Sequence, residues 1–212
     1  MSLVVVACEG KTERTFLNKV VRPAISGITF ATIDLGGNVA LELVLNALEG
    51  ASKDRQYRGA YFTTFLDLYG LGRGWLRVPF NQHAMQEQIQ QGLVGRVPDE
   101  RFFARFRPHV QPYEFESLLF SDPIKMADGL GRPDLAGKLQ EILDEFGAPE
   151  AINNSPQTSP SNRLRALLGN YNKPSLGRQA ASAVSLDTIV QRCPHFASWV
   201  EWIQSLPNRD AE

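Results

Sequence analysis

The chain has 212 residues, enough to bury a full hydrophobic core as one domain. Its 22 basic residues nearly cancel its 23 acidic ones, so nucleic-acid binding would need a local basic patch. The two cysteines are far apart and form no CxxC pair, which argues against a disulfide framework or a zinc site. No stretch approaches the roughly 20 apolar residues of a bilayer span, and no basic segment precedes the first apolar run. We therefore expect a soluble, cytoplasmic protein with no membrane partner.

Residues 4–8 predict a first strand that ends in an acid. The run Val-Val-Val-Ala-Cys is typical of a strand covered on both faces, and Gly10 allows a sharp turn into a helix that begins near residues 11–13. Glu9 then lies at the strand tip. Glu13 follows four residues later, so both carboxylates would point to one side and could share a divalent cation. Alternatively, Thr12 and Glu13 simply cap the helix.

Alternating elements follow along the chain. The patterns predict a helix over residues 15–25, a strand over 28–35, a helix over 38–49 and a strand over 59–67. This rhythm favours an α/β fold with a largely parallel sheet flanked by helices. Ligands bind such sheets outside the carboxyl ends of the strands, where Glu9 and Asp67 would both lie.

The remaining residues predict an edge strand and a helical C-terminal third. We expect residues 70–80 and a polar helix over 82–92 to form an exposed insertion. Residues 102–113 predict a strand that Pro108 and Pro112 confine to the edge of the sheet. Helices are expected to begin at 114–120 and to span 124–126, 135–146, 160–168 and 186–206. We expect a single domain over residues 1–212, with a core of about 1–122 and a helical part of about 123–212.

Five acids adjoin apolar strands and are candidate metal ligands: Glu9, Glu13, Asp67, Glu114 and Glu116. Clustered carboxylates repel one another unless a cation neutralises them, and Mg²⁺ or Mn²⁺ takes oxygen ligands. Two such ions about 4 Å apart can activate water and stabilise the leaving oxygen in phosphodiester cleavage. The last two acids would point to opposite faces of an extended segment, so only one would face the site. Alternatively, some of these acids cap helices or pair with nearby arginines.

Basic residues gather in two stretches with interleaved aromatic residues, which suits a phosphate backbone or an ordinary solvated face. The stretches are Arg96, Arg101, Arg105, Arg107 and His109, and then Arg163, Arg165, Lys173 and Arg178 beside Tyr171. In the second, residues 159–161 predict a helix start at which Arg163 would face an anion, or a helix start alone.

Two common kinds of site have little support. The three histidines are well separated and there is no G-x-S-x-G, which argues against a zinc site and a Ser-His-Asp triad. The glycines of residues 70–74 lack the Lys-Ser/Thr of a P-loop, so a flexible loop is favoured there.

Five segments together resemble the bacterial family of domain of unknown function 4276. They are Val-x-x-Glu-Gly-x-Thr-Glu at 6–13, Thr-Thr-x-x-Asp-x-Tyr-Gly-Leu at 63–71, Pro-Tyr-Glu-Phe-Glu-x-Leu-Leu-Phe at 112–120, Pro-Ser-Asn-Arg-Leu at 160–164 and Cys-Pro-His-Phe-x-x-Trp at 193–199. That family resembles the TOPRIM fold of topoisomerases, primases and the overcoming-lysogenization-defect (OLD) nucleases. The resemblance therefore implies a TOPRIM-like fold over almost the full chain.

In the OLD nucleases, a strand-end Glu, a second Glu four residues on, an Asp-x-Asp and another acid hold two metals. The resemblance carries this set to Glu9, Glu13, Asp67 and Glu116, with Arg163 as the basic residue that stabilises the phosphate and either Glu114 or Glu116 as the source of the one charge that is missing. The second Asp of the motif is Tyr69 here, which cannot replace a carboxylate.

The resemblance implies a divalent-metal-dependent phosphoryl-transfer enzyme. It would be a nuclease acting on DNA or RNA, with an ATPase partner, in phage defence or DNA repair. Glu9, Asp67 and Arg163 would carry the chemistry. The alternative is a noncatalytic module that binds nucleic acid or an ATPase, because Tyr69 removes one acid.

Overall fold

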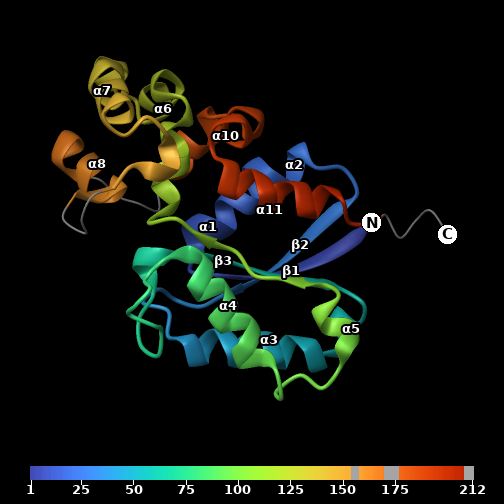
Figure 1. The fold of residues 1–212 in the computed structure, drawn as a ribbon. Coiled ribbons are helices and arrows are strands. Elements are labelled where there is room, and N and C mark those ends of the chain that lie inside the picture. The colour runs from blue at the N-terminus through green and yellow to red at the C-terminus, as the bar shows by residue number, and fades with distance from the viewer. Residues whose placement is uncertain (154–157, 170–176, 208–212) are drawn as a thin grey trace.

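The computed structural model places one parallel sheet between two layers of helices (Figure 1). It describes residues 1–153, 158–169 and 177–207. The strand order is β2-β1-β3-β4, and β5 also pairs with β3. The strands are β1 (Ser2–Cys8), β2 (Ile28–Asp34), β3 (Tyr61–Asp67), β4 (Phe106–Arg107) and β5 (Val110–Gln111). The predicted α/β fold with a parallel sheet and a helical C-terminal part is confirmed.

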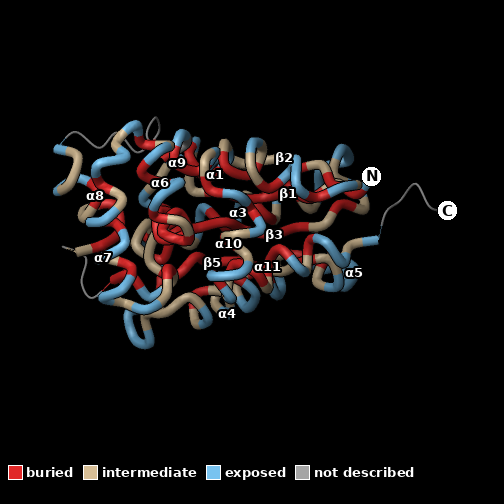
Figure 2. Tube along the Cα trace, turned by 90° about the horizontal axis from the view of Figure 1, so that it is seen from above, coloured by how far each residue is buried: buried red, intermediate tan, exposed pale blue. Residues whose placement is uncertain are grey.

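The crossovers place the first helices on opposite faces of the sheet. The first connection runs through α1 (Lys11–Phe16), a π-helical turn (Leu17–Val21) and α2 (Arg22–Ala24), and the second through α3 (Leu41–Lys53). The step from β1 to β2 and the step from β2 to β3 run in opposite directions across the sheet. Because both crossovers are right-handed, their helices must lie on opposite faces of the sheet. The two faces accordingly carry separate hydrophobic clusters. Figure 2 shows β1 and β3 buried along most of their length.

The edge strand is present but broken in two. Both β4 and β5 pair with β3 in parallel, and Pro108 lies between them. The Thr64 hydroxyl spans the break, because it accepts the His109 N–H at 2.9 Å and donates to the His109 carbonyl at 2.7 Å. The predicted strand began too early, since α5 (Glu100–Phe103) precedes it and is capped by Asp99, whose carboxylate accepts the Arg101 N–H.

Two segments expected to be exposed instead contribute to the core. Helix α4 (Gln82–Leu93) buries Met85, Ile89 and Leu93, a stripe with a spacing of four residues, against the face that α3 covers. Trp75 is 5% exposed, and its indole N–H donates to the Val39 carbonyl at 2.7 Å. The prediction of an exposed insertion is therefore wrong for these residues.

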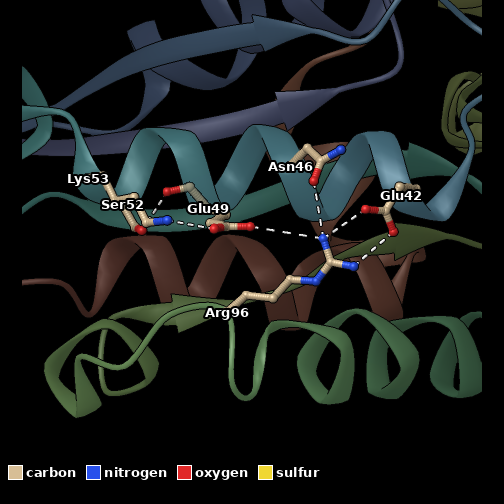
Figure 3. A network of polar contacts seen from close by, with 6 residues as sticks. All are labelled: Glu42, Asn46, Glu49, Ser52, Lys53 and Arg96. Atoms are coloured by element: carbon tan, nitrogen blue, oxygen red, sulfur yellow. Dashed lines mark hydrogen bonds and ion pairs between the residues drawn. The ribbon is translucent and has the colours of Figure 1, made fainter.

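A charged network fastens the loop after α4 to α3 (Figure 3). The Arg96 guanidinium donates to both carboxylate oxygens of Glu42, at 2.8 and 3.0 Å, and to the Asn46 amide oxygen at 3.1 Å. The Glu49 carboxylate lies 4.0 Å away and also pairs with Lys53. Arg96 thus has partners within the fold, and phosphate binding stays a prediction for it.

The C-terminal part packs on the face that α1 covers, where Leu139, Leu164 and Trp199 share a cluster with Phe65 of the sheet. This shared cluster supports a single domain over residues 1–212, which stays a prediction.

No helix in the described ranges is both long and apolar enough to cross a membrane. The elements are the 3₁₀ helix η4 (Phe115–Ser121), α6 (Pro123–Gly129), α7 (Ala136–Phe146), α8 (Pro160–Leu168), α9 (Arg178–Ala183), α10 (Leu186–Arg192) and α11 (Pro194–Gln204), with short 3₁₀ turns at Arg55–Tyr57, Leu68–Gly70, Pro133–Leu135 and Pro149–Ala151.

All three histidines meet at one place despite their separation in the sequence. The ring of His195 stacks on that of His109 with centroids 4.9 Å apart, and that of His83 meets it edge-on at 5.4 Å. His109 is 1% exposed, and its burial, together with the neighbouring His195, holds its pKa well below the usual value. Burial also lowers the pKa of His195. The folded protein therefore keeps His109 neutral.

We predict that the free energy of unfolding falls as the pH drops from about 7 to about 5.5. The unfolded chain binds a proton near the usual histidine pKa of 6.5, whereas the folded His109 does not, so stability is lost by up to about 1.4 kcal/mol per pH unit for this residue. Chemical denaturation at several pH values measures the slope. His109→Gln should flatten it, and Val94→Ala, at an exposed position that carries no titratable group, is the control. An unchanged slope in His109→Gln contradicts this assignment.

Candidate functional site

Three strand-end acids lie at the carboxyl edge of the sheet. Glu9 follows β1, and Asp34 and Asp67 are the last residues of β2 and β3, the two neighbours of β1. The chain leaves β1 toward α1 but leaves β2 and β3 toward the face of α3 and α4. Adjacent loops that diverge in this way open a crevice, where ligands bind α/β sheets.

A pocket of about 320 Å³ at this edge is lined by Glu9, Glu13 and Asp34. Glu13 comes from the first turn of α1 and is 2% exposed. The Asp34 carboxylate also accepts the Gly36 N–H at 3.1 Å. The sequence analysis missed Asp34, although it ends a strand as Asp67 does. The strand-end rule applied to all three strands would have found it.

The thiol of Cys8 responds to the negative charge around this pocket. Burial, and then the carboxylates of Glu13 and Asp34, raise the Cys8 pKa to about 12, against the opposing charge of Arg14. The thiol therefore stays protonated and is no nucleophile. The two carboxylates come from different elements but act on one buried group, which indicates a negative potential where β1 ends.

The Glu9 carboxylate lies directly over Gly70. A Cβ built on Gly70 would fall 2.0 Å from Glu9 Oε2, so only glycine leaves room for this side chain. Gly70 belongs to the short turn that follows Asp67. The acid of β1 thus reaches the exit of β3.

Asp67 and Glu116 are both buried, at 2% and 0% exposure. Asp67 Oδ1 accepts the Phe115 N–H at 2.8 Å, which places η4 and its Glu116 beside the end of β3. Asp67 therefore has a structural role as a hydrogen-bond acceptor, whether or not it also binds a metal ion.

Glu114 is engaged elsewhere. Its carboxylate accepts the Ser161 N–H at 2.8 Å and the Ser161 hydroxyl at 2.9 Å, so it caps α8. The anion that residues 159–161 were expected to attract is a carboxylate of the chain itself. The role of Glu114 as a metal ligand stays a prediction.

Arg163 points to α7. Its guanidinium lies 4.8 Å from the ring centre of Phe146, pairs with Glu145 at 3.3 Å and donates to the Thr158 carbonyl at 2.8 Å. These contacts give it a structural role, and phosphate binding stays a prediction for it. Arg165 instead lines a pocket that also contains Glu114. Lys173, Tyr171 and the Arg178 side chain lie outside the described residues.

The donors suit a hard divalent cation in kind, because every candidate is a carboxylate and the field at Cys8 is negative. Among the described residues, however, no three or more His, Cys, Asp or Glu side chains lie close enough together to hold a metal ion. The acids gather at one edge without forming a ready-made metal cage.

Comparison with curated proteins gave no match. Among solved structures, two of the C-terminal region of the OLD protein of Xanthomonas campestris pv. campestris, phased with iodine and with mercury, resemble the chain at 15% identity. Their TM-scores are 0.45 and 0.44, with 97% and 96% of this chain and 99% and 98% of theirs covered. The model of the family Domain of unknown function (DUF4276) matches residues 8–204, as the sequence motifs predicted, and the chain belongs to this family.

Proposed function

We propose that this chain is a divalent-metal-dependent phosphoryl-transfer enzyme, and specifically a nuclease. The proposal rests on the pocket that Glu9, Glu13 and Asp34 share at the carboxyl edge, the edge at which the buried Asp67 ends its strand. Mg²⁺ or Mn²⁺ bound there would supply an activated water and a Lewis acid for the phosphate. An ATPase partner, which the family resemblance implies, and a cytoplasmic place of action, which the sequence analysis expects, belong to the same proposal.

The residues of the chain have separate tasks in this proposal. Glu13, Asp34 and Asp67 would hold the cation, and Glu116 of η4 is a further candidate ligand. Glu9 also acts as general acid or base, because its carboxylate lies at the pocket and at the exit of β3. A bound cation would offset the mutual repulsion of these carboxylates.

Asp67→Asn should reduce Mg²⁺- or Mn²⁺-dependent cleavage of DNA or RNA at least a hundredfold. Losing the charge of a carboxylate that would hold the cation weakens transition-state stabilisation by several kcal/mol, and about 1.4 kcal/mol is tenfold in rate. Stability should be kept, since the asparagine oxygen still accepts the Phe115 N–H. Nuclease assays, with and without a candidate ATPase partner, and thermal melts measure the two effects.

Asp67→Ala is the matched variant, because it removes the acceptor as well and should lower stability by about 1–3 kcal/mol. Cleavage that survives both a chelator and Asp67→Asn rejects the metal mechanism.

Gly70→Ala should reduce cation affinity and cleavage without changing any charged residue. The new methyl group would occupy the place of the Glu9 carboxylate, and the end of this flexible side chain would move away. Gly70 has no positive φ, so alanine can take its backbone conformation. Titration calorimetry with Mn²⁺ measures the affinity.

Gly137→Ala is the control for this substitution, because a Cβ there meets nothing within 4 Å. Unchanged affinity and activity in Gly70→Ala would remove Glu9 from the site.

The second candidate function is a noncatalytic module that binds nucleic acid or an ATPase. Two observations favour this module. Tyr69 stands in place of an acid, and no three His, Cys, Asp or Glu side chains of the described residues lie close enough together to hold a metal ion. Calorimetry separates the two candidates. The enzyme should bind Mn²⁺, and Asp34→Asn should weaken that binding, whereas the module should give no heat of binding.

A further inference from the structure

A second pocket, of about 420 Å³, adjoins the acidic edge of the sheet. Its lining includes Tyr69, Arg77 and Phe80 from the segment that follows β3, and Glu114, Asn162 and Arg165 from the helical part. Tyr69 lies two residues after Asp67 and directly before Gly70, over which the Glu9 carboxylate is placed. A ligand in this pocket would therefore lie next to the candidate metal ligands. The volume is that of a small-molecule site.

Two aromatic rings form one wall of this pocket. The rings of Tyr69 and Phe80 are nearly parallel, with an interplanar angle of 18° and centroids 6.5 Å apart. Both side chains are partly exposed. Tyr113 packs edge-on against Tyr69 at 5.6 Å, and the Asn153 amide donates to the Tyr69 hydroxyl, so the ring is held in place. Fixed, partly exposed aromatic faces are what an unpaired nucleobase stacks on.

Two arginines supply positive charge beside these rings. Arg165 donates to the Asn162 amide oxygen at 2.6 Å, and Arg77 contacts the Gly72 carbonyl at 3.4 Å. Neither arginine takes part in the ion pairs found among the described residues. Both side chains are exposed and can meet a phosphate. The one acid of the pocket, Glu114, accepts two hydrogen bonds from Ser161, which offset its charge.

We propose that this pocket binds an unpaired base and its flanking phosphates in single-stranded nucleic acid. Tyr69 and Phe80 stack on the base, and Arg77 and Arg165 bind the phosphates. The proposal rests on the proposed nuclease function and names its substrate class. A duplex is excluded because both faces of a paired base are covered by its neighbours in the stack. Tyr69 then serves as a nucleic-acid contact at the position where the related motif has an acid.

Fluorescence anisotropy with the full chain, in a chelator that prevents cleavage, tests this proposal. The probes are a labelled oligothymidylate, an oligouridylate, an abasic strand of equal length and a duplex. The two base-bearing single strands should bind about tenfold more tightly than the abasic strand and the duplex. Equal affinity for the abasic strand overturns base stacking, and full competition by thymidine monophosphate overturns a polymer site.

Substitutions separate the contributions of the rings and of the charges. Tyr69→Leu and Phe80→Leu keep apolar bulk, and each should weaken single-strand binding about tenfold but leave abasic binding unchanged. Arg77→Gln and Arg165→Gln should weaken all strands equally and lower the salt slope by about one each. Trp202→Ala and Arg132→Gln, away from the pocket, are the controls. Unchanged binding in the Leu and Gln variants, with melting temperatures kept, overturns the proposal.

Binding measured in the chelator and cleavage measured in Mn²⁺ together separate this proposal from the proposed nuclease activity. Single-strand binding without any cleavage in Mn²⁺, with and without a candidate ATPase partner, would support the pocket and refute phosphoryl transfer. Cleavage of duplex and abasic strands as fast as of base-bearing single strands would support the chemistry and refute the pocket.

Discussion

The hydrogen bond from the Phe115 N–H to the Asp67 carboxylate joins the central strand to the helical part. Asp67 is 2% exposed and Phe115 is fully buried, so neither group can replace this bond with one to water. From Phe115 the chain continues through η4, in which all seven residues are buried. The helical part is therefore attached to the sheet through a carboxylate that the proposed chemistry also uses. Substitutions of Asp67 must keep the acceptor if they are to report on charge alone.

Two further carboxylates hold the starts of helices in the C-terminal part. Glu114 accepts hydrogen bonds from Ser161 at the start of α8. Glu150 accepts the N–H groups of His195 and Phe196, at 2.9 and 3.0 Å, at the start of α11. The first N–H groups of a helix have no partner within the helix, and the helix dipole favours an acid there. Acids that cap helices and acids that could bind a cation thus lie side by side in this chain.

The sequence predicts the strands well and the contacts of single side chains poorly. The apolar runs of β1 and β3 leave little choice, because both strands are buried on two faces. The apolar stripe of α4 is hard to recognise in the sequence because only polar residues and a glycine fill the positions between Met85, Ile89 and Leu93. The sequence does not predict the ion pair between Arg163 and Glu145, because Glu145 belongs to α7 and a local sequence pattern does not show contacts between separate helices. Cap and ligand acids such as Glu114 and Glu9 look alike in a sequence, because both stand where an apolar run ends.

The charges of a nearly neutral chain are separated around one glycine. The Glu9 carboxylate, which lines the acidic pocket, lies over Gly70, and the preceding residue, Tyr69, lines the second pocket with Arg77 and Arg165. A polyanion is attracted only where the local field is positive, and it is repelled by carboxylates unless a cation lies between them. In the proposed arrangement, the arginines bind the flanking phosphates. A cation bound by the acids would offset their repulsion of the one phosphate that lies next to them. A second acid at Tyr69 would repel the strand at the border between the two pockets, whereas a ring there holds a base.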